Sequence, residues 1–217
     1  MTRVKICGIT SPSEASLAIH YGAHAIGLLV GQRHNASDFV STRTACQIAQ
    51  NLPPFVTCVL VTHIEDPAEV IRLANRVPCH AIQLHSDLSF VQLAALRKQL
   101  RPRKVIGKVS VQDESAIDRA KSIQGSVDAV LLDSIDPLLG KVGGTGLVHD
   151  WKVSATIAAS LSVPIILAGG LTPLNVRQAI AAVRPWAVDV NSGVEGRSGQ
   201  KSEDRVRKFL RAVAAAG

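Results

Sequence analysis

A single (β/α)8 barrel is the α/β fold that the sequence predicts, and three observations predict it. Apolar runs recur at intervals of roughly 20 to 30 residues. Several of these runs are continuously apolar, as is typical of parallel strands that are buried on both faces. An amphipathic stretch follows each run. Eight such pairs fill the 217 residues, so we expect one TIM-barrel domain over residues 1–217. A doubly wound open sheet is the alternative, although no G-x-G-x-x-G motif follows the first run.

The predicted strands and helices alternate along the chain. The strands are Val4–Cys7, Ala25–Val30, Val56–Val61, Ala81–Leu84, Val105–Val109, Ala129–Leu132, Pro164–Ala168 and Ala187–Val190. The helices cover Ser13–His20, Thr42–Gln50, a segment that begins at Asp66, Ser89–Leu100, Asp113–Ala120, Asp150–Leu161, Pro173–Ala182 and Glu203–Ala216. Asp66 and Pro67 are typical of a helix start, because an N-cap side chain is followed by a proline in the first turn.

The composition indicates a globular protein and argues against two kinds of partner. Apolar residues make up 47% of the chain, and no apolar run reaches the roughly 18 residues of a membrane-spanning helix. The net charge of +7 fits either solvated helix faces or an anionic substrate. Aromatic residues make up only 3%, and no basic-aromatic motif occurs. We therefore predict no membrane partner and no nucleic-acid partner.

Two further features of the sequence predict where the protein is located and whether it binds a metal. The chain enters a strand at once without a signal-peptide pattern, so we expect the mature protein to start at Met1 and to be cytoplasmic. The histidines show no metal-ligand spacing, so we predict no metal. The cysteines form no C-x-x-C motif and are expected to be free thiols; they are Cys7, Cys46, Cys58 and Cys79.

Two strand ends hold residues suited to proton transfer. Cys7 ends the first predicted strand before Gly8, and Asp133 ends the sixth. Active sites of such barrels lie at the carboxyl ends of the strands, so a base and an acid would face each other across one opening. A lone cysteine is often a small core residue, and an aspartate after a strand is often a turn former. We predict catalytic roles for both because of their positions.

Glycine-rich loops follow the last strands and predict a phosphate site. Gly169 and Gly170 follow the seventh strand, and the eighth leads into Asn191, Ser192 and Gly193. Phosphate sites of such barrels lie after strands 7 and 8, where glycines let backbone N–H groups approach the anion. A further glycine-rich loop around Gly144 follows the sixth strand, where it is a connection, a lid or an anion cradle.

Two polar residues at other strand ends are candidates for weaker reasons. His85 ends the fourth strand, where a histidine is more often a structural hydrogen-bonding residue than an acid or base. Asp189 lies in the eighth strand beside the predicted phosphate loops. An anion repels phosphate, so we expect Asp189 to order loops or to bind a sugar hydroxyl.

Taken together, these motifs resemble the phosphoribosylanthranilate isomerase family, whose members are (β/α)8 barrels of tryptophan biosynthesis. The similarity extends over essentially the whole chain. It rests on Lys5-Ile6-Cys7-Gly8-Ile9-Thr10, Ile82-Gln83-Leu84-His85, Leu131-Leu132-Asp133, Gly143-Gly144-Thr145-Gly146 with Asp150-Trp151, Ala168-Gly169-Gly170-Leu171-Thr172-Pro173 with Asn175-Val176, and Val188-Asp189-Val190 with Ser192-Gly193-Val194-Glu195.

The resemblance implies an Amadori rearrangement of N-(5-phosphoribosyl)anthranilate to 1-(2-carboxyphenylamino)-1-deoxyribulose 5-phosphate. In this family an acid protonates the ribose ring oxygen, the ring opens to a Schiff base, and a thiolate then takes the proton from C2. Matching the motifs assigns the base to Cys7 and the acid to Asp133. The resemblance implies no cofactor, because the iminium is the electron sink, and it implies a phosphosugar substrate and a monomer or homodimer.

One segment departs from the family pattern. After the second strand the family has an arginine that pairs with the anthranilate carboxylate, and alignment on Phe39-Val40-Ser41 places Asp38 there. Arg33 or His34 could supply the cation in its place. The alternatives are a relative that acts on a different phosphoribosylated amine, or a non-catalytic barrel that binds a phosphosugar.

Overall fold

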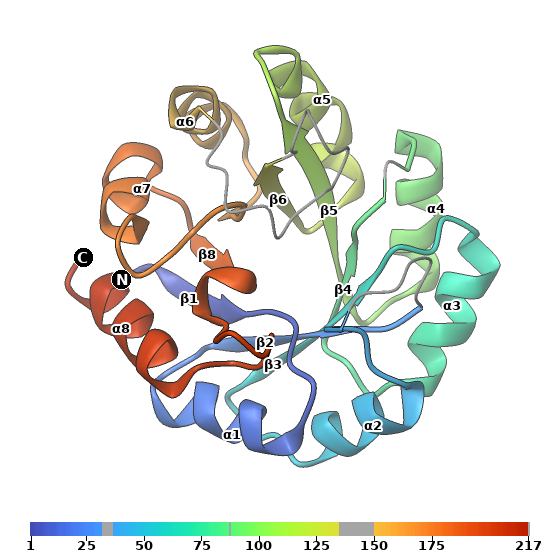
Figure 1. Ribbon diagram of the computed structural model, residues 1–217. Helices are drawn as coiled ribbons and strands as arrows, with labels where there is room; N and C mark the ends of the chain where they lie inside the picture. Colours follow the sequence, from blue (N-terminus) through green and yellow to red (C-terminus); the bar gives the residue numbers. More distant parts are fainter. Residues whose placement is uncertain (32–36, 87, 135–149, 217) are drawn as a thin grey trace.

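The chain folds into a closed barrel of parallel strands surrounded by helices (Figure 1). The computed structural model describes residues 1–31, 37–86, 88–134 and 150–216. The strands follow one another around the barrel in sequence order, and pairing of β1 with β8 closes it. The predicted (β/α)8 fold is therefore confirmed.

The eight strands of the barrel are short. They are β1 (Arg3–Ile6), β2 (Ala25–Leu29), β3 (Thr57–Thr62), β4 (Ala81–Leu84), β5 (Lys104–Val111), β6 (Ala129–Ser134), β7 (Ile165–Leu167) and β8 (Ala187–Val190). The prediction gave the bounds of β4 and β8 correctly. It ended β6 at Leu132, whereas Asp133 and Ser134 continue the strand in register with β5.

One α-helix follows each strand within the described residues. They are α1 (Pro12–His20), α2 (Thr42–Gln50), α3 (Pro67–Arg76), α4 (Phe90–Gln99), α5 (Ser115–Ile123), α6 (Trp151–Ser160), α7 (Val176–Val183) and α8 (Glu203–Ala214), with short 3-10 turns η1 (Gln124–Ser126) and η2 (Ser192–Val194). Asp66 caps α3 as expected, because its carboxylate accepts the N–H of Glu69 at 2.8 Å. The helix α7 begins at Val176, later than the predicted Pro173.

Successive strand residues face opposite sides of the barrel wall. Ile6 and Leu132 face outward into the large apolar cluster that also contains side chains of the helices. Cys7 and Leu131 belong instead to the smaller cluster inside the barrel. This alternation decides which residues reach the opening at the carboxyl ends of the strands.

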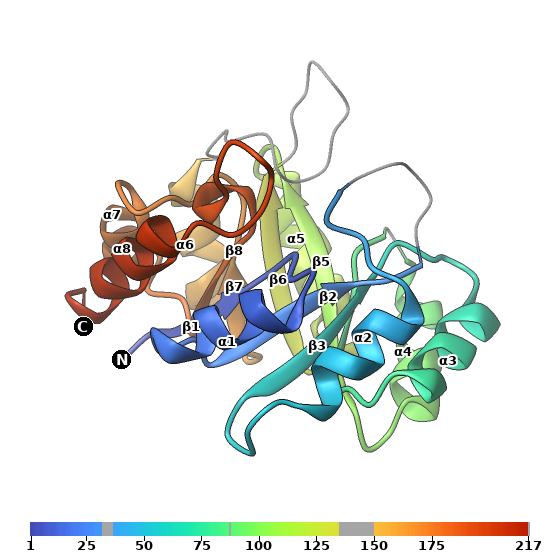
Figure 2. The ribbon, with the colours of Figure 1, turned by 60° about the horizontal axis from the view of Figure 1, so that its bottom comes forward.

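The two chain ends lie close together beside α8 and the start of β1 (Figure 2). No helix within the described residues is long and apolar enough to cross a membrane.

Candidate active site

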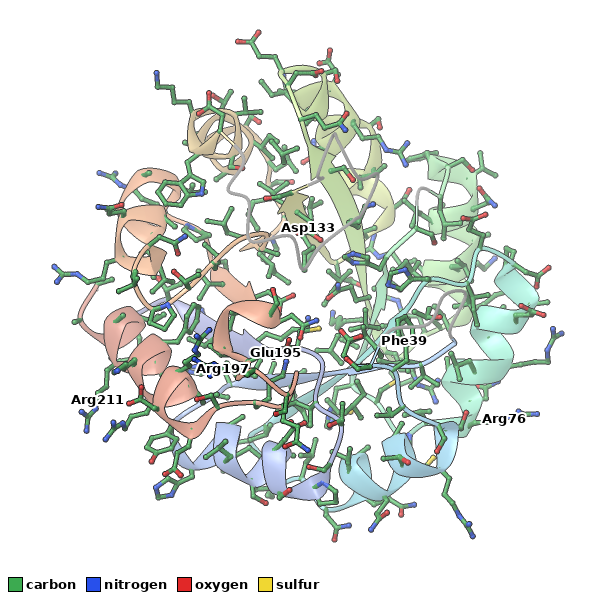
Figure 3. The ribbon with its side chains drawn as sticks, in the orientation of Figure 1. Phe39, Arg76, Asp133, Glu195, Arg197 and Arg211 are labelled. Atoms are coloured by element: carbon green, nitrogen blue, oxygen red, sulfur yellow. The ribbon has the colours of Figure 1, made fainter. Side chains whose placement is uncertain are left out.

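The predicted acid and base both lie inside the barrel at the carboxyl ends of their strands. Cys7 directly follows β1 and Asp133 is the penultimate residue of β6, and both are buried. Figure 3 shows Asp133, Glu195 and Phe39 on different sides of the barrel opening. The strand register thus brings together groups that are distant in the sequence.

The thiol of Cys7 lies beside the side chain of Lys5. A Cβ atom at Gly27 of β2 would lie 2.6 Å from Sγ of Cys7 and 2.9 Å from Cε of Lys5, so glycine leaves the space that both side chains need. Burial raises the pKa of the Cys7 thiol to about 11, the neighbouring Lys5 ammonium opposes this rise, and the Asp189 carboxylate adds to it. The thiol form therefore predominates near neutral pH.

Lys5 is a buried cation held by two side chains. Its Nζ donates to Oδ2 of Asp189 at 2.7 Å and to Oε1 of Gln83 at 3.0 Å. Burial acts to lower the pKa of Lys5, but the Asp189 carboxylate and the Cys7 group hold it above its ordinary value. Lys5 is therefore an ammonium ion, and Asp189 is its counter-ion.

A second set of contacts connects Gln83 to Asp133. Nε2 of Gln83 lies 3.1 Å from Nδ1 of His85, and Nε2 of His85 lies 3.3 Å from Oδ2 of Asp133. The other carboxylate oxygen of Asp133 accepts the backbone N–H of Ser134 at 2.9 Å. A continuous row of polar side chains therefore joins β8, β1, β4 and β6 across the interior.

The two loops predicted to bind phosphate pack directly against each other. A Cβ atom at Gly193 would run into the carbonyl oxygen of Leu171, so only glycine allows this approach. Gly169 and Gly170 have φ values of 80° and 63°, a region that favours glycine. Asn175 fixes the first loop, because its side chain accepts from Thr172 N–H at 2.7 Å and donates to Gly170 O at 2.9 Å.

Several backbone N–H groups of these loops are available to a ligand. Those of Gly170, Ser192 and Gly193 donate to no protein acceptor within the part of the chain that the structure describes. Uncommitted N–H groups at the carboxyl end of a barrel are suited to bind an anion.

The comparisons with known proteins agree with this geometry. The family model for N-(5′-phosphoribosyl)anthranilate (PRA) isomerase matches residues 4–212. The chain belongs to this isomerase family.

Relatives and solved structures of the same family cover nearly the whole chain. An N-(5′-phosphoribosyl)anthranilate isomerase 2 of Methanosarcina mazei is 41% identical over 96% of this chain and 92% of the relative. The Haloarcula marismortui isomerase is also 41% identical, over 97% of this chain and 95% of the relative.

Among solved structures, the Thermotoga maritima isomerase has a TM-score of 0.86 and 34% identity, and covers 99% of this chain and 100% of its own. A family structure with reduced 1-(o-carboxyphenylamino)-1-deoxyribulose 5-phosphate bound has a TM-score of 0.83 and 33% identity, with the same coverage.

Asp38, at the position where the sequence comparison expected an arginine, contacts the loop after β8. Oδ2 of Asp38 accepts the side-chain N–H of Asn191 at 2.7 Å. Oδ1 of Asn191 accepts from Nζ of Lys201 at 2.6 Å, and Lys201 also donates to Glu195 at 2.7 Å. The side chain of Asn191 is therefore engaged at both of its polar atoms, and its backbone carbonyl also accepts from Lys201 and from the N–H of Val194, both at 3.3 Å.

Aromatic rings line the side of the opening near β3 and β4. The ring of His63 lies 5.4 Å from Phe39 and 4.9 Å from His85, measured between centroids. One phenyl ring and two imidazole rings therefore contact one another in sequence and end at His85.

The structure also tests how complete the sequence prediction was. Arg33, His34 and Gly144 lie outside the described residues. The sequence analysis did not predict Lys5 and Gln83 as site residues. Lys5 lies two residues before Cys7, and Gln83 lies two residues before His85. Because alternate residues of a strand face the same side, this spacing could have indicated that both side chains point into the barrel. The roles of Lys201 and His63 had no such signal, because they depend on how loops fold.

Proposed function

We propose that this chain is a phosphoribosylanthranilate isomerase of tryptophan biosynthesis that uses Cys7 as the base and Asp133 as the acid. One observation supports the assignment above all others. In a member of this family, a buried thiol and a buried carboxylate lie inside the same barrel opening, joined by one row of polar side chains. We further propose that a single domain over residues 1–217 carries this activity.

The first step that we propose is opening of the ribose ring. Protonated Asp133 gives its proton to the ring oxygen, and the C1–O bond breaks as the amine nitrogen forms an iminium. The carboxylate that remains accepts the Ser134 N–H at 2.9 Å and faces Nε2 of His85 at 3.3 Å, which stabilises the developing charge.

The second step is removal of the proton at C2 by Cys7. The thiolate is the useful base, and burial disfavours it in the free enzyme. Two positive charges oppose this effect: the Lys5 ammonium beside the thiol, and the iminium that the first step creates. The electrons of the C–H bond move into the iminium and give the enolamine, which becomes the ketone product. The substrate thus supplies its own electron sink, and we propose that no cofactor or metal is needed.

The phosphate site that we propose is the pair of loops after β7 and β8. The backbone N–H groups of Gly170, Ser192 and Gly193 support it, because they have no protein acceptor within the described residues. The close packing of Gly193 on Leu171 keeps the two loops together. Crystals soaked with inorganic phosphate should show the anion at these groups, and an anion bound only elsewhere would overturn the assignment.

We propose a double role for Asp189. Its Oδ2 balances the charge of Lys5, while its buried Oδ1 has no partner within the described residues. A buried carboxylate oxygen without a donor is costly unless a ligand supplies one. A ribose hydroxyl is the donor that we propose.

We propose that a cation from the segment after β2 binds the carboxylate of the anthranilate moiety. Asp38 occupies the position that the family resemblance gives to arginine, and it binds Asn191. We propose Arg33 or His34 as the replacement. If neither binds the carboxylate, a different phosphoribosylated amine is the second candidate substrate.

The decisive experiment is an assay of the purified protein with N-(5-phosphoribosyl)anthranilate. Conversion should be followed by fluorescence, and the product should be identified by mass. Rescue of a tryptophan auxotroph that lacks the isomerase provides an independent readout. A well-folded protein that binds the substrate without turnover would overturn the enzyme assignment in favour of a phosphosugar-binding barrel.

The proposed function also includes an oligomeric state and a cellular location. One solved structure is of monomers generated from the dimeric isomerase of Thermotoga maritima. For this chain we propose a monomer or homodimer in the cytoplasm, with a phosphosugar as its ligand and no membrane or nucleic-acid partner.

A further inference from the structure

Gln83 occupies a central place in the row of polar side chains. It is 1% exposed, and it contacts Lys5 through Oε1 at 3.0 Å and His85 through Nε2 at 3.1 Å. One side chain of β4 thus lies between the cation beside the base and the imidazole beside the acid.

The chemistry of these groups fixes the direction of each hydrogen bond. An ammonium can only donate, so the atom of Gln83 that faces Lys5 must be the amide oxygen. The amide nitrogen, which can only donate, then faces Nδ1 of His85. Nδ1 therefore has to be the unprotonated nitrogen of the ring. A neutral imidazole has one N–H, and it must be on Nε2, where it faces Oδ2 of Asp133 at 3.3 Å.

We propose that Gln83 is a positioning residue that holds His85 as the neutral Nε2–H tautomer, so that the ring presents an N–H, and not a lone pair, to Asp133 across 3.3 Å. The catalytic consequence rests on the function proposed above. The positive end of an N–H dipole on the ring nitrogen nearest Oδ2 stabilises the carboxylate that remains after Asp133 has protonated the ring oxygen. The other tautomer would point a lone pair at that carboxylate. Of the groups that face His85, Asp133 comes from β6, Gln83 from β4, and His63 from the segment after β3.

The tautomer can be measured without any substrate. In protein labelled with ¹⁵N-histidine, the two ring nitrogens of His85 should give one protonated signal at Nε2 and one unprotonated signal at Nδ1. His80 and His24 are internal references, because each accepts a backbone N–H at Nδ1, from Cys58 at 2.9 Å and from Val4 at 3.2 Å. Protonation of Nδ1 of His85 in the wild-type protein would overturn the proposal.

The substitution Gln83→Glu tests the cause. The new carboxylate can still accept from Lys5, but it has no N–H to offer, so Nδ1 of His85 should become protonated while His80 and His24 keep their signals. With the anthranilate substrate, kcat should fall at least about tenfold and KM should change little, because the change affects the acid and not the binding loops. Gln99→Glu, which makes the same charge change at an exposed end of α4, should leave both readouts unchanged.

Two further outcomes keep the inference separate from the proposed function. If Gln83→Glu does not fold, Gln83→Met removes the amide without adding charge, and His85 should then lose its single tautomer. An unchanged His85 spectrum in whichever variant folds would overturn the positioning role. A wild-type protein that shows the expected tautomer but does not convert the anthranilate substrate would refute the proposed function alone and support the tautomer assignment.

Discussion

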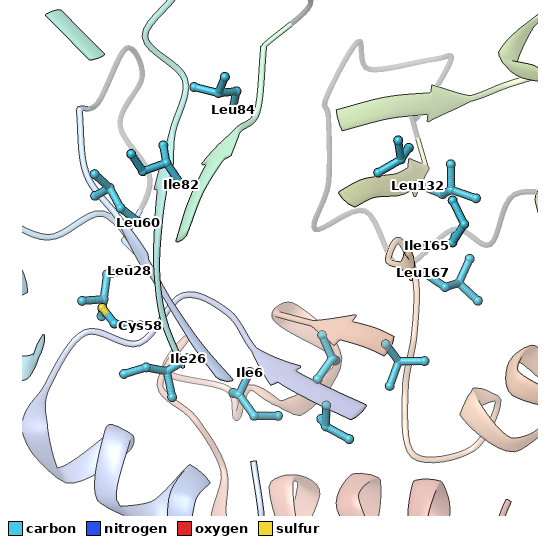
Figure 4. Packing of buried hydrophobic residues seen from close by; sticks show 14 of the residues in the cluster. Ile6, Ile26, Leu28, Cys58, Leu60, Ile82, Leu84, Leu132, Ile165 and Leu167 are labelled. Atoms are coloured by element: carbon cyan, nitrogen blue, oxygen red, sulfur yellow. The ribbon is translucent and has the colours of Figure 1, made fainter. Parts of the chain in front are cut away.

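The inner surface of the barrel and the layer between the barrel and the helices are built from the same strands but differ in chemistry. Leu132 points into the outer layer, where buried apolar side chains pack together (Figure 4). Asp133, the next residue, lies inside the barrel against His85. The same contrast separates Val188 from Asp189. One strand therefore contributes stability on one side and chemistry on the other, and neighbouring residues should respond to substitution in opposite ways.

The largest effects are expected inside the barrel. Cys7→Ala and Asp133→Asn should each lower kcat by about 10² to 10⁴, which is the contribution of a general acid or base. Both variants should remain folded, because neither change opens a cavity in the outer layer. Steady-state kinetics and thermal unfolding measure the two effects separately. Near-normal turnover by either variant would remove that residue from the proposed mechanism.

The matched substitution on the outer side is Leu132→Ala. It removes a fully buried side chain from the layer against the helices, so unfolding free energy should fall by about 2 to 5 kcal/mol. The kcat of the folded fraction should stay within about threefold of wild type, because the inward face of β6 is untouched. Urea unfolding and active-site-normalised kinetics check this. A loss of kcat comparable to that of Asp133→Asn would break the contrast between the two surfaces.

The contrast also explains how far the sequence could predict the molecule. The apolar runs predicted the fold because both faces of each strand are buried, and they gave β4 and β8 with their observed bounds. The prediction ended the apolar run of β6 at Leu132 because Asp133 is polar, whereas an inward-facing strand residue can be polar at the barrel opening. Position alone singled out Cys7 and Asp133. It could not show that Lys5 and Gln83 connect their surroundings.

The buried thiols offer a smaller and more graded test. Burial raises the pKa of Cys58 in the outer layer to about 12 and that of Cys7 to about 11, both above the ordinary 9.0. The folded state therefore holds these protons more tightly than the unfolded state does. This stabilisation is fully present below pH 9 and is lost as the pH rises towards 11 for Cys7 and 12 for Cys58, by about 1.4 kcal/mol per pH unit for each thiol.

Denaturant unfolding between pH 8 and pH 11 should reveal this loss. Cys58→Ala and Cys7→Ala should each show a shallower fall than wild type. Comparison of Cys58→Ala with wild type cancels the lysines and the tyrosine that titrate in the same range, whereas Cys7→Ala also changes the titration of Lys5. For Cys7 the difference should level off at a lower pH, because the Lys5 ammonium favours its thiolate. Parallel curves for wild type and both variants would contradict the burial argument.

The loop contacts mark the limit of sequence prediction. Asp38 and Asn191 are 153 positions apart, and their contact depends on how two loops meet above the barrel. No local pattern specifies such a pair, because loop conformation follows from tertiary packing. The resemblance to the family led only to an expectation about the residue type at position 38. The structure shows that Asp38 binds a protein group, the side chain of Asn191.

The smallest expected effect therefore concerns Asp38. Its bond to Asn191 is made to protein and not to substrate, so Asp38→Asn should lower kcat/KM by about fivefold, equivalent to roughly 1 kcal/mol for a partly exposed bond. The reduction should be equal for the anthranilate substrate and for a phosphoribosylated aniline that lacks the carboxylate.

Asp38→Arg separates the alternatives, because it removes the same bond and adds a cation. A selective gain for the anthranilate substrate would show that position 38 still faces the carboxylate and that the wild-type chain lacks its partner. An equal loss for both substrates would place the carboxylate away from Asp38, and Arg33→Ala and His34→Ala would then show which side chain binds it.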